Sequence, residues 1–337
     1  MLRKIIATAV SLAIAALAGA VSTPASAEGQ KLVLAPPGVP PIFISIVTFV
    51  ARDQGFFKKY GADVELRQFD NGTAAARAVV SGDLDVSMSS TALVVSQIAN
   101  AGVNLVGIYG FSRPDFQVGT TDGAKATCAD IKGQQVGVDT PGGARSIALK
   151  QILASGCHMS IDDVQQVALG SNTSQAMIAG QIKYGLLHLD DVPEIEAHGK
   201  KVTVIKTLLE SNPSAHNLII VARKDRIAEK RDAFVRMVAG LIAATRFMAD
   251  PKNEERVATI AEVTGRTHAL ALDALRGYLK YGLWSPSDDG MNQKQLEGYI
   301  EQQVKAGNIK EGKAPPTYAQ LVDPTIWRDA NALVAKQ

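Results

Sequence analysis

The sequence predicts a two-lobed α/β protein in which two sheets of largely parallel strands face each other across a cleft. Three observations predict it: strands and helices alternate over residues 31–110, the alternation restarts after residue 110, and the two stretches are weakly similar at a spacing of about 100 residues. Such alternation favours parallel strands joined by right-handed crossovers. Two lobes built on one plan explain the repeat most simply, and chance similarity between common βα patterns is the alternative.

The first 27 residues are predicted to be an export signal. Arg3 and Lys4 precede an apolar run over residues 5–21, and Ala25-Ser26-Ala27 forms a small-residue cleavage site. A membrane anchor is the alternative, but the apolar run is short and small residues follow it. We therefore expect a free periplasmic protein that begins at Glu28.

The charge balance argues against nucleic-acid or anionic-membrane partners. Of the 35 Lys and Arg residues, two lie in the signal, so the remaining 33 balance the 33 Asp and Glu residues. A neutral chain lacks the basic surface that phosphate backbones or anionic lipids attract. After the signal, no run reaches the ~18 consecutive apolar residues that a membrane span needs.

The first lobe is predicted to hold four strand–helix units, with strands at 31–35, 64–69, 85–88 and 104–109. Polar turns follow the first three strands and open helices, at residues 36–41, 71–73 and 89–91. Turns of this kind converge on one edge of an α/β sheet, where ligands are held. No acid, base or nucleophile set stands out among them, so the pattern indicates binding without chemistry.

The second lobe is predicted to repeat this plan over residues 112–221. Asn71-Gly72-Thr73 is echoed by Asn172-Thr173-Ser174, and a glycine-rich turn follows the strand 135–138 as the proline-rich turn follows the first strand. Residues 111–119 and 211–221 are interpreted as two crossings that form a hinge. Residues 28–111 and 222–337 then make lobe 1, on which helices at 233–248 and 296–306 are expected to pack.

Two cysteines leave one question open. Cys128 precedes the strand 135–138, and Cys157 ends the helix that follows it. A helix packed antiparallel to its strand returns to the edge where the strand began, so the thiols could meet in a compartment that permits disulfides. A disulfide and two free core cysteines are both compatible with the sequence. Metal binding is not expected, because no Cys/His cluster completes a ligand set.

Several motifs in this order resemble the substrate-binding proteins of ABC transporters. They are Asp53-Gln-Gly-Phe-Phe-Lys-Lys-Tyr-Gly-Ala-Asp-Val-Glu-Leu66, Gly82-Asp-Leu-Asp-Val86 and Ala129-Asp-Ile-Lys-Gly-Gln-Gln-Val-Gly-Val138. The resemblance is to the group that includes the sulfonate, taurine and nitrate binders and the thiamine-pyrimidine-precursor (NMT1/THI5-like) proteins. One departure is Lys183, which stands where that group often has an acid.

The resemblance implies the type II periplasmic-binding-protein fold and a small-molecule ligand held between the lobes. It also implies delivery to an inner-membrane permease with its ATPase, by a monomer without cofactor or catalytic residues. The solute is expected to be a small polar or anionic organic compound, with a pyrimidine-like or other aromatic compound as the alternative. A THI5-like pyrimidine synthase is a further alternative, but this chain lacks the cysteine-rich segment of those enzymes.

Carrying the family's cleft onto the matching turns gives the candidate ligand-binding residues. Hydroxyls and free backbone N–H groups at helix starts suit an anionic or strongly polar head group. Arg145 could pair with a carboxylate or sulfonate, or lie on the solvated face, and His188 could contact a polar group, or be a satisfied residue at a strand end. The hydroxyl residues and Asp190 could instead only cap their own helices. Gly110, Arg113 and Pro141 are weaker candidates. The predicted set is Pro37, Gly38, Asn71, Gly72, Thr73, Ser89, Ser90, Thr91, Gly142, Gly143, Ala144, Arg145, His188 and Asp190.

Overall fold

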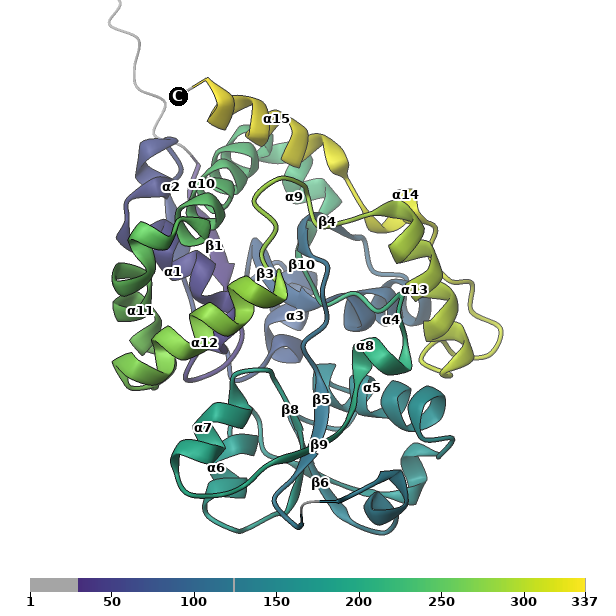
Figure 1. The fold of residues 1–337 in the computed structure, drawn as a ribbon. Helices are drawn as coiled ribbons and strands as arrows, with labels where there is room; N and C mark the ends of the chain where they lie inside the picture. Colours follow the sequence, from purple (N-terminus) through teal and green to yellow (C-terminus); the bar gives the residue numbers. More distant parts are fainter. Residues whose placement is uncertain (1–29, 124, 337) are drawn as a thin grey trace, which may run out of the picture.

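A computed structural model describes residues 30–123 and 125–336. The predicted export signal, residues 1–27, lies outside this part of the chain. Figure 1 shows two α/β lobes, one above the other, with the helices that follow residue 224 mostly around the upper lobe. Among the described residues no helix is long and apolar enough to cross a membrane.

The upper lobe is built on a five-stranded sheet with the order β2-β1-β3-β10-β4. β1 pairs in parallel with β2 and β3, and β10 is antiparallel to both β3 and β4. These strands are short apolar runs whose residues are largely buried, as expected for strands covered by helices on both faces. They are β1 (Leu32–Ala35), β2 (Val64–Leu66), β3 (Val86–Ser90), β4 (Leu105–Phe111) and β10 (Leu218–Arg223).

The lower lobe repeats this topology with the order β7-β6-β8-β5-β9. β6 is parallel to β7 and β8, and the antiparallel strand β5 lies between β8 and β9, as β10 lies between β3 and β4. The two lobes therefore share one plan, as the internal echo predicted. The strands are β5 (Gln117–Thr120), β6 (Gln135–Val138), β7 (Gln165–Ala168), β8 (Tyr184–Leu187) and β9 (Thr203–Thr207).

The chain passes between the sheets twice, from β4 to β5 and from β9 to β10. One predicted boundary needs correction. Residues 218–221, assigned to the second lobe from the sequence, belong to β10 and pair with β3 and β4 in the first sheet. The return crossing ends earlier because Leu218 already starts the buried apolar run of that strand.

Helices cover both sheets and extend the first lobe. α10 and α12 join its apolar core, where Phe43, Phe234 and Tyr278 are buried together with residues of α1, as predicted for the C-terminal helices. The helices are α1 (Ile46–Asp53), α2 (Phe56–Lys59), α3 (Gly72–Ser81), α4 (Thr91–Ala101), α5 (Ala144–Gln151), α6 (Thr173–Ile178), α7 (Asp191–Ala197), α8 (Leu208–Ser211), α9 (Lys224–Glu229), α10 (Arg231–Ala249), α11 (Glu254–Ala261), α12 (His268–Tyr281), α13 (Gln293–Lys305), α14 (Tyr318–Leu321) and α15 (Pro324–Ala335).

Cys128 and Cys157 form a disulfide, which settles the alternative that the sequence left open. α5 continues through a π-helical turn, Ile152–Gly156, and ends beside the 3₁₀ turn that holds Cys128. The Cα atoms of the two cysteines are 5.4 Å apart, within the usual range for a disulfide. The bond lies entirely within the lower lobe.

Candidate functional site

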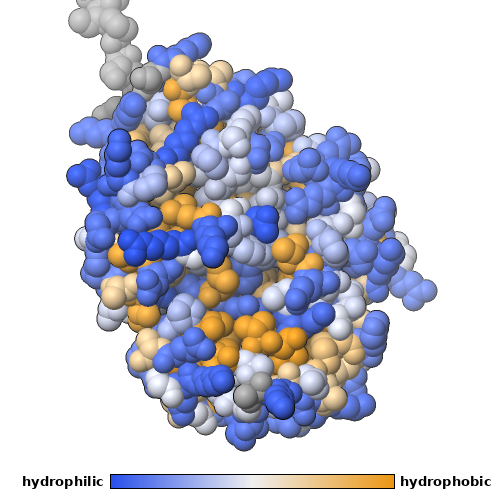
Figure 2. Space-filling view, in the orientation of Figure 1, coloured by the Kyte–Doolittle hydropathy of each residue, from blue (hydrophilic) through white to orange (hydrophobic). Residues whose placement is uncertain are grey.

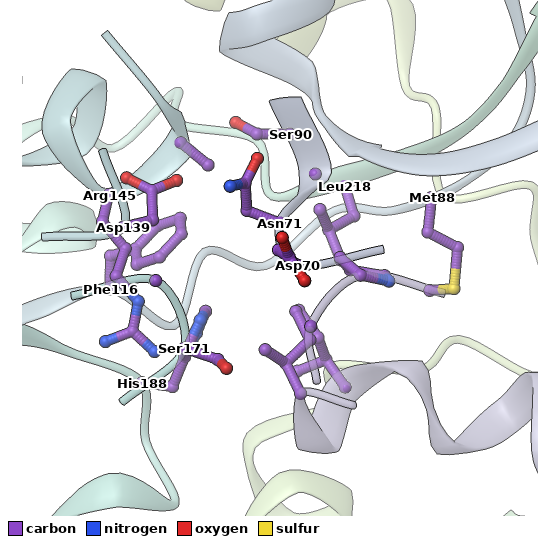
Figure 3. Close-up of a pocket in the computed structure, with 17 residues that line it drawn as sticks. Asp70, Asn71, Met88, Ser90, Phe116, Asp139, Arg145, Ser171, His188 and Leu218 are labelled. Carbon is purple, nitrogen blue, oxygen red and sulfur yellow. The ribbon is translucent and has the colours of Figure 1, made fainter. Parts of the chain in front are cut away.

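A cavity of about 50 Å³ lies between the two lobes. Its walls are the turns that follow the parallel strands of both sheets, together with residues of the two crossings. Figure 3 shows polar side chains from both lobes around it, and Figure 2 shows apolar side chains gathered near the junction of the lobes on an otherwise hydrophilic face. The lining residues are Pro37, Gly38, Ile42, Ile44, Asp70, Asn71, Gly72, Met88, Ser90, Phe116, Asp139, Ala144, Arg145, Gly170, Ser171, His188 and Leu218.

The topology explains why these turns meet. In each sheet the first three parallel strands end at the same edge, and each of them contributes a turn to the cavity. Gly38 shows how closely the backbone is folded there, with a φ of +95° and an ideal Cβ position 2.7 Å from the carbonyl oxygen of Pro40. Only glycine fits this position without strain.

Eight of the fourteen predicted residues line the cavity. In the upper lobe they include Asn71, whose side-chain oxygen accepts a hydrogen bond of 2.9 Å from the backbone N–H of Ala74 and so caps α3. Capping and lining the cavity, offered as alternatives by the sequence, are therefore both true of Asn71. The eight residues are Pro37, Gly38, Asn71, Gly72, Ser90, Ala144, Arg145 and His188.

Three predicted residues of the upper lobe do not line the cavity. Ser89 points to the opposite face of β3 from Ser90, since side chains alternate along a strand, and its hydroxyl lies 2.9 Å from that of Ser87. Thr91 is buried, with its hydroxyl 2.8 Å from Nδ1 of His216. Thr73 lies one residue further into α3, and its buried hydroxyl has no partner among the described residues.

The other residues outside the cavity belong to the lower lobe or to a crossing. Gly142 is exposed, Gly143 packs against the carboxylate of Asp139, and Asp190 lies in a neighbouring charged cavity. The weaker candidates Gly110, Arg113 and Pro141 are also absent from the lining: Gly110 packs on Gly290, Arg113 stacks on the ring of Tyr281, and Pro141 is exposed.

Sequence reasoning missed several lining residues that stand next to predicted ones. Asp70 precedes Asn71, Met88 alternates with Ser90, and Asp139 is the first residue after β6. Applying strand alternation and the strand-end rule strictly would have found these three. Phe116 comes from the first crossing and Leu218 from the start of β10, and no local pattern distinguishes them from core residues.

A second cavity, of about 270 Å³, adjoins the first and shares Ile42, Arg145, Ser171 and His188 with it. Arg266, from the turn between α11 and α12 of the upper lobe, reaches into it. Its guanidinium contacts Asp190, Asp191 and Glu194 of the lower lobe. All four side chains are more than nine-tenths buried. This ion cluster joins the two lobes, and its long-range partner was not predictable from the sequence pattern.

Protonation in this cluster follows from burial and geometry. The Tyr278 hydroxyl lies 2.6 Å from Asp115 Oδ2 and 2.6 Å from Asp190 Oδ1. A hydroxyl has one proton to donate, so the second contact requires a proton on one carboxylate. Burial raises the pKa of Asp190 despite the opposing charge of Arg266, whereas the pKa of Asp115 is lowered, so Asp190 is the more readily protonated of the two.

Asp115 and His188 form a buried pair at the border of the two cavities. His188 Nδ1 donates to Asp115 Oδ2 over 2.9 Å, and Asn217 Nδ2 donates to Asp115 Oδ1 over 3.1 Å. Burial opposes ionisation of Asp115, but the charge and hydrogen bond of His188, with those of Tyr278 and Asn217, hold its pKa below the usual value. The pair fixes the orientation of the imidazole at the cavity wall.

The lobes touch across the cleft, so the structure is a closed form. Ser171 Oγ of the lower lobe donates to the carbonyl oxygen of Val39 in the upper lobe over 3.1 Å. In the described part of the chain, no group of three or more His, Cys, Asp and Glu side chains could hold a metal ion. The arrangement is suited to enclosing a small molecule between two lobes.

Comparison with solved structures shows a common fold. A protein from Bordetella bronchiseptica RB50 superposes with a TM-score of 0.75 at 22% identity, covering 90% of this chain and 98% of that one. The alkanesulfonate-binding protein SsuA from Xanthomonas axonopodis pv. citri gives 0.70 at 13% identity, covering 88% and 99%. The nitrate-binding protein NrtA from Synechocystis PCC 6803 gives 0.71 at 12% identity, covering 92% and 90%. The fold is that of the periplasmic binding proteins, as predicted.

Sequence comparison gives the family. A protein from Brucella abortus (strain 2308), named "Putative binding protein", is 25% identical over 295 residues, covering 81% of this chain and 85% of its own length. A relative of the same name from Brucella suis biovar 1 matches equally. The family described as NMT1/THI5 like matches residues 43–254, which is more than half of the chain. The chain therefore belongs to the NMT1/THI5-like family.

Proposed function

We propose that the protein is an extracytoplasmic solute-binding protein that captures a small organic solute by lobe closure and delivers it to an ABC permease. One observation carries the proposal: a small enclosed cavity is lined by equivalent turns from two lobes of the same topology. Proteins with this fold include the ligand-binding component of an ABC-type import system from Staphylococcus aureus and the alkanesulfonate-binding protein from Xanthomonas axonopodis pv. citri. The predicted export signal and the disulfide support a periplasmic location.

The permease would recognise the closed form of the protein. The open form would bind the solute through one lobe, and contacts from the other lobe would stabilise the closed form. The Ser171–Val39 hydrogen bond and the Arg266 cluster are the interlobe contacts that closure makes.

A synthase role has less support. The chain has two cysteines, and they are bonded to each other, so neither thiol is free for redox or metal chemistry. The buried Asp115–His188 pair is held by Asn217 and Tyr278 and serves to orient a binding side chain.

Native mass spectrometry of the exported protein, followed by denaturation, tests the proposal. We expect one small molecule to co-purify in a one-to-one complex, and its return to the stripped protein should raise Tm and reduce the radius of gyration in solution scattering. A stripped protein whose Tm and radius of gyration respond to no solute, including any released one, would contradict capture by closure.

A further inference from the structure

We propose that the solute is a small organic cation, with an ammonium or amidinium group that Asp139 and Asp70 bind inside the cavity. This inference rests on the proposed function and names the class of solute for the same site. It replaces the expectation of an anionic head group, which was based on helix starts and on Arg145.

Asp139 is a buried carboxylate without a cationic partner. It is 8% exposed and lines the cavity directly after β6. Its Oδ1 accepts the backbone N–H of Thr140 over 2.8 Å, but Oδ2 has no donor and no basic side chain within 4.0 Å among the described residues. Burying an unpaired carboxylate is unfavourable, so its retention here indicates a charge supplied from outside the chain.

The backbone is shaped around this carboxylate. The ideal Cβ position of Gly143 would lie 2.5 Å from Asp139 Oδ2, so only glycine leaves room for the side chain as it stands. The hydrogen bond to Thr140 is a structural role, but asparagine or serine could accept it as well. The carboxylate also lies at the N-terminus of α5, where the helix dipole favours a negative charge, but no cationic side chain pairs with it among the described residues.

Each basic group of the cleft already has at least one acid or carbonyl partner on the chain, although Arg145 and His188 keep ring or guanidinium nitrogens with no partner among the described residues. Arg145 Nη1 donates to the carbonyl oxygen of Leu186 over 2.6 Å and lies 3.4 Å from Asp191 Oδ2. Arg266 contacts three carboxylates of the lower lobe, and His188 Nδ1 donates to Asp115. An anionic solute would have to share Arg145 and His188 with these partners, whereas Asp139 has no cationic partner to displace.

A second carboxylate reaches the cavity from the opposite lobe. Asp70 is exposed at the end of the turn after β2, lines the same cavity, and has no ion pair among the described residues. Both carboxylates line one small cavity, so a cation bound between the lobes would reduce the repulsion between them. Binding of a cation and closure would then favour each other.

The rest of the lining defines the body of the solute. Ile44, Met88, Phe116 and Leu218 give apolar walls, and Phe116 adds an aromatic ring of the kind that attracts cations. Asn71 and Ser90 add neutral hydrogen-bonding groups from the upper lobe, as Figure 3 shows. The site therefore fits a solute that has a compact apolar skeleton and one positively charged group that donates hydrogen bonds.

Thermal-shift measurements on matched compounds test the inference. The panel uses pairs with one skeleton and opposite charge: butylamine against butane-1-sulfonate, and benzylamine and benzamidine against benzoate. We expect the cations to raise Tm with saturation and the anions to leave it unchanged. Asp139→Asn, which keeps the Oδ1 acceptor, should weaken the best cation at least tenfold, and Asp70→Asn should weaken it less because Asp70 is exposed.

The control is Asp273→Asn, which removes an exposed acid of α12 far from the cavity lining and should leave binding unchanged. A panel in which no cation stabilises the protein, or in which the best cation binds Asp139→Asn as tightly as the wild type, overturns the inference. Stabilisation by an anion in the same panel would leave the proposed capture function standing, whereas the absence of any stabilised compound would count against both.

Discussion

The two lobes have the same strand order but different chemistry at equivalent turns. In the upper lobe the turns after β1, β2 and β3 bring the neutral groups Pro37, Asn71 and Ser90 to the cavity, together with the exposed Asp70. In the lower lobe the equivalent turns bring Asp139, Ser171 and His188, and a cluster of three further acids lies behind them. The upper lobe supplies mainly shape and neutral hydrogen bonds, with one exposed carboxylate, and the lower lobe supplies the buried charged groups.

The charge of the lower lobe is balanced from the other side of the cleft. Arg266 stands on a turn of the upper lobe yet contacts the acids of α7. A duplicated fold can therefore divide its functions: one lobe acquires a charged site, and an added helix pair on the other lobe stabilises that site only when the lobes are closed.

Replacing Arg266 with Met should have the largest effect on stability. The variant keeps an apolar stem over Phe43 but leaves Glu194 buried without a cation and Asp191 with Arg145 alone, a loss of about 3–5 kcal/mol for a broken buried pair. Urea unfolding measures it. Arg276→Met is the control, because the pair of Arg276 with Glu254 is half exposed and should contribute about 1 kcal/mol or less.

The pH dependence of that loss identifies its cause. Burial raises the pKa of Asp190 and of Glu194, so ionising these groups destabilises the closed form at neutral pH, and the penalty disappears once they are protonated. Without Arg266 the penalty is larger. The difference between variant and wild type should therefore shrink as pH falls towards 5, and a constant difference would contradict an ionic cause.

Removing the disulfide should affect the lower lobe alone. Replacing both Cys128 and Cys157 with Ser releases a crosslink that spans 29 residues, with an expected loss of about 3 kcal/mol from the greater freedom of the unfolded chain. Because the bond lies away from the cavity lining, solute affinity should stay within about twofold. A large loss of solute affinity in a double variant that is still fully folded would show that the disulfide also positions the turn after β6.

Buried His216 should make the free energy of unfolding depend on pH. It is 1% exposed beneath the Ser90–Thr91 turn, and burial lowers its pKa to about 4, although its hydrogen bond to Gly290 opposes the shift. Its folded pKa is lower than the unfolded value, so stability is complete above about pH 6.5 and falls towards pH 4. The loss is about 3 kcal/mol for a shift of this size.

A His216→Gln variant tests this assignment, since Gln keeps one donor and one acceptor for Gly290 and Thr91. Urea unfolding between pH 7 and pH 4 should show that this component is lost in the variant. His268→Gln serves as the control, because His268 is exposed and has its own pair of acidic partners. An unchanged acid profile in His216→Gln would contradict a buried neutral imidazole.

The sequence predicted the architecture because periodic patterns encode it. Strands 135–138 and 184–187 have the predicted bounds. The sequence similarity between the segments around Asn71 and Asn172 predicted two sheets of the same topology. It could not predict Arg266 as a partner of Asp191, because the two are 75 residues apart and meet only through the packing of α12 on the first lobe. It also assigned Arg145 to the ligand or to solvent, although β8 and α7 provide its partners Leu186 and Asp191.

The echo itself predicted one wrong equivalence. Asn172 is exposed and does not cap α6, and Ser171, one residue earlier, lines the cavity instead. The turn Gly170-Ser171-Asn172 approaches its helix differently from Asp70-Asn71-Gly72, since Gly170 has a φ of +59°. Sequence alignment of the two halves cannot register such a shift, because it depends on one backbone angle.

Asn71 and Asn172 give the smallest and sharpest test of the difference between the lobes. Asn71→Ala should lose about 1 kcal/mol of stability with the cap of α3, whereas Asn71→Ser keeps a capping oxygen and should lose almost none. Both variants lack the amide at the cavity wall, so both should bind the solute more weakly than wild type. Asn172→Ala should change neither quantity. Equal effects of Asn71→Ala and Asn172→Ala would mean that the two turns are equivalent after all, and that the charge of the lower lobe alone distinguishes the halves of the site.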